Sequence, residues 1–372
     1  MSWCGCWFRT TGWHMRVEPA REPRRIVVKL TDRCNMSCGF CAQAKNRSRG
    51  VSRVVDLEFE HFERFFRTPF EDNNKLLFLW GGEPLMHPRW RDFAEFGRRR
   101  GWRVQLNTNG WLIHENLDAL PILVDDLIIS LDGLSETHDR LRRRTGAFRR
   151  VKQSISRLVR EGGPLARSVS INTVITEALL DELPAFVKEV MSWGVRGIVL
   201  ELPTFIPADQ ESAVKSHFSR LGWCYDHARA YIQDYSAFPS ARFIELYKKL
   251  LEIHGGRIGL TPVLRSSTQV RAYFATSRPL GLPYCPEINH GLVLEPDGRI
   301  VSCSDFPDTC IGSFIDTEWQ AAWRSPAYAA VRRAFDDNHP PAVCLRCCQT
   351  VWEVQSDNLP QTNVDVAPLR RT

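Results

Sequence analysis

Three cysteines stand close together in residues 31–41, which read TDRCNMSCGFC. They follow the apolar run at residues 26–30, which favours a β-strand, so we expect the thiols on the loop that leaves this strand. Thiolate sulfur is the usual ligand of iron–sulfur clusters. A four-iron cluster held by Cys34, Cys38 and Cys41 keeps one iron free for another ligand. Zinc is the alternative occupant, although structural zinc sites close with four ligands in paired spacings.

The segment from residue 25 to about residue 205 alternates between strand-like and helix-like stretches. Apolar residues such as Phe59, Phe62 and Phe66 recur at helical spacing. Repeated β–α units predict a parallel sheet with helices outside, and such a sheet can curl into a partial barrel with its site at the carboxyl ends of the strands. The expected strands are residues 26–30, 76–80, 104–107, 127–131, 169–174 and 197–200, and the expected helices are residues 57–67, 88–100, 115–119, 147–161 and 179–193.

Polar motifs follow the second and third expected strands. Gly81 and Gly82 allow a ligand to approach the backbone closely, and Glu83 offers a carboxylate to an ammonium group. The next strand ends in the sequence NTNG, where Asn107 and Asn109 supply polar side chains and Asn-Gly favours a turn. A structural turn and a ligand-lining role are equally open for this second motif.

Further polar residues follow the fourth and sixth expected strands. Ser130 ends the fourth strand, and Arg142 suits a carboxylate ligand because its guanidinium bonds in a bidentate manner. We expect His138 and Asp139 to make local loop and cap bonds rather than to act in acid–base catalysis. Glu201 follows the sixth strand, where it faces either solvent or the cavity.

A second group of cysteines lies near the C-terminus. A turn with the sequence PDG predicts a hairpin between the first two of them. Cysteines on a hairpin and in a later Cys-x2-Cys can converge on one metal centre, an iron–sulfur cluster or zinc. The cysteines of this region are Cys285, Cys303, Cys310, Cys344, Cys347 and Cys348.

Over residues 25–350 these motifs resemble the radical S-adenosylmethionine (SAM) enzymes. The resemblance implies that the open iron of the first cluster binds the amino and carboxylate groups of SAM. It also implies that a 5′-deoxyadenosyl radical made from SAM takes a hydrogen atom from the substrate. By the same resemblance, SAM is contacted by Gly81, Gly82, Glu83, Ser130 and Arg142, and Asn107 and Asn109 are further candidates to line it.

The C-terminal cysteines resemble the cluster-binding extension called SPASM, or its shortened form, the twitch domain. Both open with a cysteine, a glycine and a further cysteine five residues on, here Cys285, Gly298 and Cys303. A full SPASM domain has more cysteines where this chain has Glu353 and Asp357, so we expect one auxiliary four-iron cluster. Its expected ligands are Cys285, Cys303, Cys344 and Cys347.

Two cysteines of the C-terminal group are left over. Each of Cys310 and Cys348 can replace an expected ligand, remain an inert thiol or donate a hydrogen atom to a product radical. Donation of that atom would separate an epimerase from an oxidase. With Glu201, these two cysteines are the candidate catalytic residues.

The 372 residues are 43% hydrophobic and 25% charged, as expected for a globular protein with a large and a small domain. We expect an irregular arm to residue 24, a partial barrel at 25–208, a helical linker region at 209–280, the twitch-like domain at 281–350 and a polar tail at 351–372. Within this layout, residues 255–283 read as a long connection that walls the substrate cavity or is mobile. In the arm, Cys4 and Cys6 give only a weak metal signal and Met15 is an alternative start.

Clustered cysteines, short apolar runs and a poor secretory signal predict a cytoplasmic protein without a membrane span. The net charge is +6, and arginines concentrate at residues 98–100 and 140–150. Solvated surfaces explain most of them, and docking of an acidic electron donor such as flavodoxin or ferredoxin explains others. Nucleic acid is disfavoured because no aromatic-interleaved basic motif accompanies them.

These inferences predict a radical SAM oxidoreductase that oxidises or cross-links a peptide or natural product, with the auxiliary cluster accepting an electron. The alternative is dehydrogenation or epimerisation of a sugar or aminocyclitol. Only some 24 residues precede the first strand, too few for a leader-binding domain of about 80 residues, so a separate protein would bind a leader peptide. A zinc-binding protein without radical chemistry is disfavoured by the intact cysteine and Gly-Gly-Glu motifs. Strongly salt-dependent RNA binding would mark a tRNA-modifying enzyme.

Overall fold

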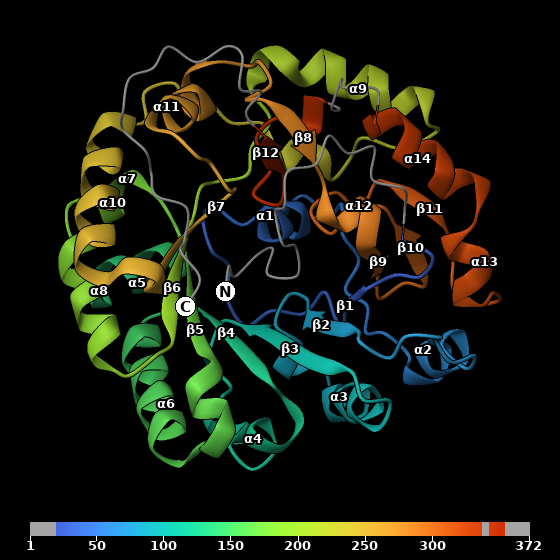
Figure 1. The fold of residues 1–372 in the computed structure, drawn as a ribbon, viewed down its shortest axis with the longest axis horizontal. Coiled ribbons are helices and arrows are strands. Elements are labelled where there is room, and N and C mark those ends of the chain that lie inside the picture. The colour runs from blue at the N-terminus through green and yellow to red at the C-terminus, as the bar shows by residue number, and fades with distance from the viewer. Residues whose placement is uncertain (1–19, 337–341, 354–372) are drawn as a thin grey trace.

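The structure is a computed structural model that describes residues 20–336 and 342–353. Its main sheet has ten strands (Figure 1). These strands are β1 (Arg25–Lys29), β2 (Leu76–Trp80), β3 (Arg103–Thr108), β4 (Asp126–Ser130), β5 (Val169–Val174), β6 (Gly197–Glu201), β7 (Ile258–Thr261), β9 (Gly291–Leu294), β10 (Arg299–Val301) and β11 (Cys310–Ser313).

The strand order is β11-β10-β9-β1-β2-β3-β4-β5-β6-β7, with parallel pairing from β9 to β7. The two edge strands β7 and β11 do not pair with one another, so the curved sheet stays open. The partial α/β barrel predicted from the sequence is therefore confirmed. All six expected strands are present, and the bounds of β2 and β5 agree with the prediction.

Helices cover the outer face of the curved sheet (Figure 1). Their apolar faces pack on the strands, and Phe62, Phe66, Phe93 and Trp102 form a fully or nearly fully buried aromatic cluster there. Burying side chains of this kind stabilises the fold by about 2 kcal/mol each. The covering helices are α2 (Phe59–Phe65), α3 (Trp90–Arg99), α4 (Leu120–Leu123), α5 (Ser135–Arg142), α6 (Ala147–Glu161), α7 (Glu177–Leu180), α8 (Leu183–Ser192), α10 (Ser240–His254) and α11 (Ser267–Ala275).

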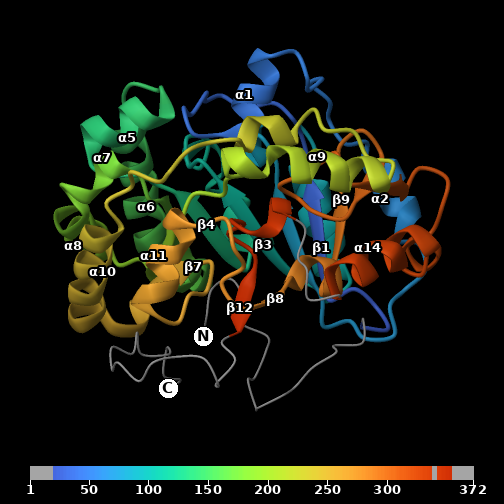
Figure 2. The same cartoon turned by 90° about the horizontal axis from the view of Figure 1, so that it is seen from above.

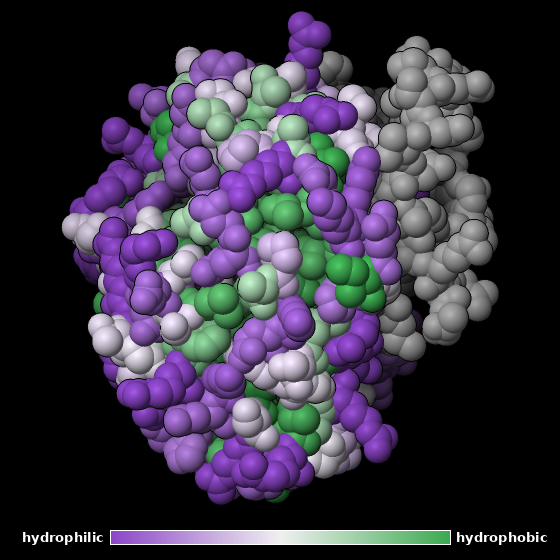
Figure 3. All heavy atoms as spheres, turned by 90° about the vertical axis from the view of Figure 1, so that its left-hand side faces the viewer, coloured by the Kyte–Doolittle hydropathy of each residue, from purple (hydrophilic) through white to green (hydrophobic). Residues whose placement is uncertain are grey.

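Two other helices, α1 (Ala42–Ser48) and α9 (Glu211–Arg220), lie at one end of the sheet (Figure 2). The C-terminal part contributes α12 (Pro286–His290), α13 (Trp319–Trp323) and α14 (Pro326–Asp336). The side of the molecule that carries α8 and α10 shows mainly hydrophilic side chains with small apolar patches between them (Figure 3). Within the described ranges, no helix combines the length and the apolarity that a membrane span requires.

Prolines move two of the expected helices. The predicted helix at residues 115–119 is wrong, because these residues form a 3-10 turn at His114–Asn116 and α4 starts only at Leu120. Pro121 sits in the first turn of α4, where its fixed φ and missing N–H are tolerated. In the same way Pro184 starts α8, so the helix predicted at 179–193 is split into α7 and α8.

Residues 255–283 are not the long connection that the composition predicts. They contain β7, which pairs in parallel with β6, and α11, which Ser266 caps through the N–H of Gln269. The strand is only four residues long, too short to give a clear alternation of apolar and polar residues. Its pairing with an existing sheet edge stabilises it.

The C-terminal cysteine region continues the main sheet. Strand β9 pairs in parallel with β1, and β10 returns beside β9 through the predicted hairpin. Gly298 has φ +90 in this turn, a conformation that favours glycine. A second, two-stranded sheet joins β8 (Leu282–Tyr284) to β12 (Val351–Glu353). This pairing brings the chain before Cys285 next to the chain after Cys347.

Candidate active site

The first three cysteines lie between β1 and α1, at the carboxyl end of β1, as predicted. Cys38 is buried, and it packs in one apolar cluster with Cys34 and Cys41. Burial raises the pKa of the Cys34 thiol to about 11. Burial also raises the pKa of Cys38, although Arg142 beside it acts in the opposite direction. Binding a metal here would release protons, because only the thiolate is a good ligand.

The Gly-Gly-Glu motif holds this cysteine loop through the backbone. The N–H of Gly82 donates to the carbonyl of Thr31 at 2.8 Å, and the N–H of Glu83 donates to the carbonyl of Arg33 at 2.7 Å. A Cβ atom on Gly82 would lie 2.2 Å from the Arg33 carbonyl oxygen. The glycines therefore admit the backbone of the cysteine loop, whereas the sequence analysis explained them by the approach of a ligand.

Asn109 also contacts the cysteine loop. Its Nδ2 donates to the Oδ1 of Asn35 at 2.7 Å and lies 3.9 Å from the Cys34 sulfur. Arg144 donates to the Asn35 carbonyl at 3.0 Å. Asn109 thus fixes the shape of the loop that carries the thiols.

Glu83 is fully buried below this loop. Its Oε1 accepts from the Thr108 hydroxyl at 2.6 Å, and its Oε2 accepts from the N–H of Asn109 at 2.7 Å. Burial raises the pKa of Glu83 to about 7, and these hydrogen bonds only partly offset that effect. A ligand with an ammonium group would favour its charged form.

Asp132 connects the ends of β4 and β5. It accepts from Arg142 Nε at 2.6 Å and from the N–H of Val174 at 2.8 Å. The N–H of Asp132 itself donates to Nδ1 of His138 at 3.1 Å, and Asp139 accepts the N–H groups at the start of α6. His138 and Asp139 therefore make the expected local bonds. Burial lowers the pKa of His138 to about 3, which keeps the ring neutral.

A cavity of about 200 Å³ lies between the first cysteine loop and the C-terminal region. Glu201 lines it, which settles the choice between solvent and cavity, and accepts from Asn172 Nδ2 at 2.6 Å. Burial raises the pKa of Glu201. Ser130 pairs with Asn172 in the neighbouring strand. Other residues that line this cavity include Cys41, Gln43, Trp80, Tyr235 and Ser304.

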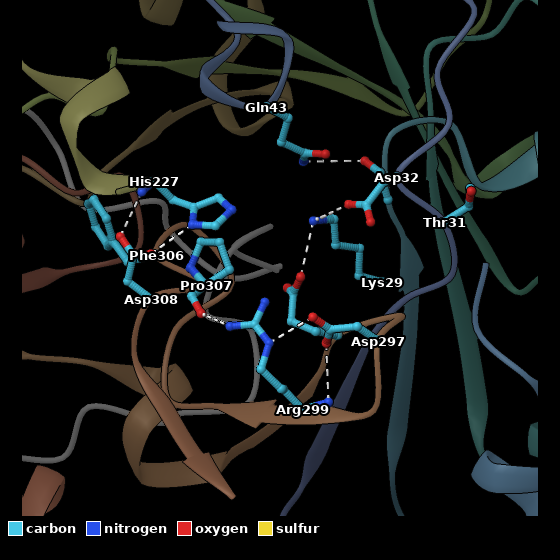
Figure 4. Close-up of polar contacts among 12 residues, drawn as sticks. Lys29, Thr31, Asp32, Gln43, His227, Asp297, Arg299, Phe306, Pro307 and Asp308 are labelled. Atoms are coloured by element: carbon cyan, nitrogen blue, oxygen red, sulfur yellow. Dashed lines mark hydrogen bonds and ion pairs between the residues drawn. The ribbon is translucent and has the colours of Figure 1, made fainter. Parts of the chain in front are cut away.

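Several polar residues of this cavity were missed by the sequence analysis. Lys29 stands on β1, where the nearly unbroken apolar run around it is the signal that such a lysine is buried. Its Nζ lies 2.8 Å from Asp32 Oδ1 and 3.1 Å from Glu295 Oε2 (Figure 4). The others come from loops or from a short 3-10 helix, which carry no such pattern. The missed residues include Lys29, His227, Tyr231 and Asp305.

The C-terminal cysteines converge as well. Cys285, Cys303, Cys344 and Cys347 line one further cavity. Burial raises the pKa of the Cys285, Cys303 and Cys344 thiols. In the parts of the chain that the structure describes, no group of three or more His, Cys, Asp or Glu side chains is spaced to hold a single metal ion. The role of the four cysteines as cluster ligands stays a prediction.

The two remaining cysteines differ in position. Cys310 lies on β11, where its sulfur contacts the Gly312 carbonyl at 3.6 Å. Its carbonyl accepts at 2.9 Å from Nε1 of Trp223, a residue that lines the cavity of the C-terminal cysteines. Cys348 is buried beside Cys347 and Glu201, and its N–H donates to the Thr204 hydroxyl at 3.1 Å. Cys348 thus adjoins Glu201, a residue of the central cavity. Cys4 and Cys6 lie outside the described residues.

Comparisons with known proteins agree with this layout. Residues 28–190 match the radical SAM superfamily, and residues 285–348 match the iron–sulfur cluster-binding domain called SPASM. The chain is 35% identical over 166 residues to an AdoMet-dependent heme synthase of Methanosarcina barkeri, which covers 43% of this chain and 45% of that protein. It is 28% identical over 145 residues to the antilisterial bacteriocin subtilosin biosynthesis protein AlbA of Bacillus subtilis, covering 38% of this chain and 31% of the relative. The chain thus spans less than half the length of these two relatives.

Solved structures show the same fold at low sequence identity. SuiB of Streptococcus suis, bound to its precursor peptide SuiA, has a TM-score of 0.56 at 14% identity, over 84% of this chain and 67% of SuiB. The protein anSMEcpe with bound AdoMet and a peptide has a TM-score of 0.58 at 15% identity, over 85% of this chain and 84% of that chain.

The radical SAM domain implies a [4Fe–4S] cluster and SAM, and the SPASM domain implies auxiliary iron–sulfur binding. The cysteines of the chain fit these groups, because their thiols form one cluster at the first loop and line a second cavity in the C-terminal region. Iron–sulfur clusters are bound by cysteine thiolates in this way. Polar atoms near the first site also remain available to a ligand. In the described structure, Asn107 Oδ1, Gln43 Oε1 and Trp80 Nε1 are buried without a hydrogen-bond partner. Buried polar atoms of this kind are rare unless a bound group satisfies them.

The motif order, the open barrel and both domain matches lead to one assignment. The chain belongs to the radical SAM superfamily of enzymes and carries a C-terminal SPASM domain.

Proposed function

We propose that this protein oxidises or cross-links a peptide or natural product by removing two hydrogens from it. The observation that carries the proposal is the place of the central cavity, which lies between the two groups of cysteines. Cys41 lines it on one side, and Ser304 and Asp305, which follow Cys303, line it on the other. A substrate bound there would contact both regions.

The chain's own residues would hold the cofactors and shield the reaction. Cys34, Cys38 and Cys41 would bind the first cluster, and Glu83 would receive the amino group of SAM. When bound, this cluster and SAM supply a radical that takes a hydrogen atom from the substrate, and an auxiliary cluster accepts an electron. Aromatic side chains of the cavity, including Trp80, would exclude water and protect a radical from side reactions.

A peptide substrate is supported by the relatives. AlbA and the sporulation killing factor maturation protein SkfB are named for the making of bacteriocin and killing-factor products, and the SuiB structure holds a precursor peptide. We include a separate leader-binding protein in the proposal as a partner.

Arginines near the first cysteine loop support an acidic electron donor such as flavodoxin or ferredoxin. Arg47 donates to the carbonyl of Asp32 at 3.3 Å, and the Arg143 guanidinium lies 3.6 Å from where a Cβ on Gly39 would stand. Positive charge beside a site speeds the approach of an acidic partner.

The test is an anaerobic reaction of the reconstituted full-length protein with SAM and dithionite. The probe is a mixture of synthetic peptides of randomised sequence. We expect 5′-deoxyadenosine and a peptide lighter by two hydrogens, and neither in Cys34→Ala. Ser216→Ala is the control, since this exposed serine of α9 is absent from the linings of both cavities. Peptide of unchanged mass beside abundant 5′-deoxyadenosine would contradict the peptide proposal.

A small polar substrate is the second candidate. The cavity of about 200 Å³ is modest in size and carries Lys29, Glu201 and Asp305, which suit the hydroxyl and amino groups of a sugar or aminocyclitol. In parallel reactions with 2-deoxy-scyllo-inosamine and with glucose, 5′-deoxyadenosine above the substrate-free level would favour this candidate. A product of unchanged mass that gains solvent deuterium would indicate epimerisation.

A further inference from the structure

A short segment that borders the central cavity is fixed by one buried carboxylate. Asp308 accepts the N–H groups of His227 and Ala228, both at 2.9 Å, and lies 3.1 Å from the Cys224 sulfur. From the other side, Asn46 Nδ2 on α1 donates to the His227 carbonyl at 3.1 Å. The backbone of His227 is therefore held from two directions.

The His227 ring is held by the same carboxylate. Its Nδ1 lies 2.7 Å from Asp308 Oδ1, and the Asp308 side chain is 0% exposed. Burial acts to raise the pKa of Asp308, but the hydrogen bonds from His227 and Ala228 outweigh it and leave the pKa lowered. A charged carboxylate only accepts hydrogen bonds, so Nδ1 carries a proton, and in the neutral ring Nε2 is the nitrogen with the free lone pair.

The second ring nitrogen is turned toward the cavity. His227 lines the same cavity as Lys29 and Gln43, and Figure 4 shows its ring directed into the space that these two side chains also face. The His227 side chain is 17% exposed, so it is sheltered but accessible from the cavity. This arrangement of a buried carboxylate, an imidazole and an open cavity is that of a general base.

Other ionisable groups of the cavity are engaged elsewhere. Lys29 is paired with Asp32 and Glu295. Glu201 accepts from Asn172 at 2.6 Å. Burial raises the pKa of Asp305 to about 7, and this carboxyl lies 3.8 Å from the sulfur of Cys347, an expected cluster ligand. The phenols of Tyr231 and Tyr235 have pKa values raised by burial, so neither readily becomes a base. His227 is the one imidazole among the described residues that line this cavity.

We infer that His227 is the catalytic base that removes a proton from the substrate, and that Asp308 is its positioning residue. This inference rests on the function proposed above. The first cluster and SAM, when bound, would supply the radical that takes one hydrogen atom from a substrate carbon. A neighbouring O–H, S–H or N–H would give its proton to His227 Nε2, and its electron pair would stay on the heteroatom. An auxiliary cluster held by the C-terminal cysteines would accept the one remaining electron as the carbon–heteroatom bond forms or gains π character.

The test compares His227→Asn, Asp308→Asn and the control His254→Asn, a histidine at the end of α10 that is absent from the linings of both cavities. Asparagine at 227 can still donate to Asp308, so the segment keeps its anchor. In reactions with a peptide that the wild type oxidises, we expect His227→Asn to form oxidised product about 100-fold more slowly. Its iron content and its 5′-deoxyadenosine formation from SAM alone should match the wild type. Asp308→Asn should lower kcat and leave KM unchanged.

Chemical rescue separates a base from a structural role. Adding imidazole to His227→Ala should restore product formation, because free imidazole can take the proton in the vacated space. Asp308→Asn should gain nothing from imidazole. Product formation in His227→Asn equal to that of the control would overturn the inference.

A measurement without turnover distinguishes failure of the inference from failure of the proposed function. Diethyl pyrocarbonate acylates accessible neutral imidazoles, and peptide mass spectrometry locates the adduct. We expect His227 of the full-length protein to be acylated although it is mostly buried. If His254 reacts and His227 does not, the ring is closed to the cavity and the inference fails. If the wild type makes no 5′-deoxyadenosine, the proposed function fails, whatever the acylation shows.

Discussion

The two groups of cysteines are built in different ways. Cys34, Cys38 and Cys41 come from one loop, and residues of neighbouring strands hold that loop through Asn109 and the backbone of Gly82. The other group assembles Cys285 and Cys303 with residues some 40 positions further on, where β12 pairs with β8. The first group borders the open cavity through Cys41, whereas the second is enclosed in a cavity of its own.

This difference follows from what each site has to do. A site that binds SAM and meets a substrate needs an open face and can rely on a preformed loop. A site that only passes electrons needs no open face. When its ligands come from distant segments, the bound cluster also links these segments and stabilises the fold. The first group should therefore control chemistry, and the second should control both electron transfer and stability.

Replacing Cys34, Cys38 and Cys41 together by Ala should have the largest effect on activity. We expect about four of eight irons to be lost, because one cubane cluster is lost. SAM cleavage to 5′-deoxyadenosine should fall below detection. The loop is held by its neighbours, so the melting temperature should change little. Iron analysis, low-temperature EPR with and without SAM, and calorimetry measure these outcomes; a large loss of stability would erase the distinction between the two groups.

Replacing Cys344 and Cys347 by Ala should give the converse pattern. The auxiliary irons should be lost and oxidised product should disappear, while 5′-deoxyadenosine still forms from SAM. Losing a cross-link between distant segments should lower the melting temperature by about 5 °C or more. The same measurements apply, with Ser216→Ala, at an exposed serine of α9, as the control. Unchanged product formation would show that the second cluster is not the electron acceptor.

Arg346 allows the stability of the second group to be tested without touching a thiol. It stands between Cys344 and Cys347, is 0% exposed, and donates to the carbonyls of Leu345 and Arg278 at 2.5 and 3.1 Å. Burial lowers its pKa to about 10, so it stays charged at neutral pH. Arg346→Met leaves these carbonyls without their hydrogen-bond donor. The substitution should lower the free energy of unfolding by about 2–4 kcal/mol.

The expected readout for Arg346→Met is a lower melting temperature together with partial loss of the auxiliary irons. The first cluster should keep its SAM-sensitive EPR signal. Arg324→Met, at an exposed arginine in the same part of the chain, is the control. Equal stability of the two variants would mean that the buried guanidinium does not hold the cysteine turn.

The comparison also explains how far the sequence could be interpreted. The first site was predictable because its ligands are neighbours in sequence and because six β–α repeats fix the place of the loop. The strand positions followed from apolar runs, and Pro121 and Pro184 explain where the helix bounds were wrong. The cavity residues Lys29, His227 and Asp305 were missed because they come from separate segments. Only the tertiary fold places His227 against Asp308, which is 81 residues away in the chain.

Glu83 gives the smallest predicted effect, a dependence of SAM affinity on pH. Its folded pKa is about 7, above its ordinary value of 4.5, because burial disfavours the charged carboxylate. The folded protein therefore holds this proton more tightly than the unfolded chain does. Between pH 4.5 and 7 the contribution of Glu83 to the free energy of unfolding falls as pH rises. The ammonium group of SAM favours the carboxylate, so SAM affinity should rise up to about tenfold from pH 6 to pH 8.

Equilibrium dialysis with labelled SAM measures this dependence. Glu83→Gln should bind SAM weakly and with a flatter pH profile, because its amide does not titrate and cannot supply the negative charge. Glu58→Gln, at an exposed carboxylate before α2, should keep the wild-type profile. If the wild type and Glu83→Gln share one profile, Glu83 does not receive the ammonium group. Its buried carboxylate then acts only through Thr108 and Asn109, and another group of the site receives the ammonium group of SAM.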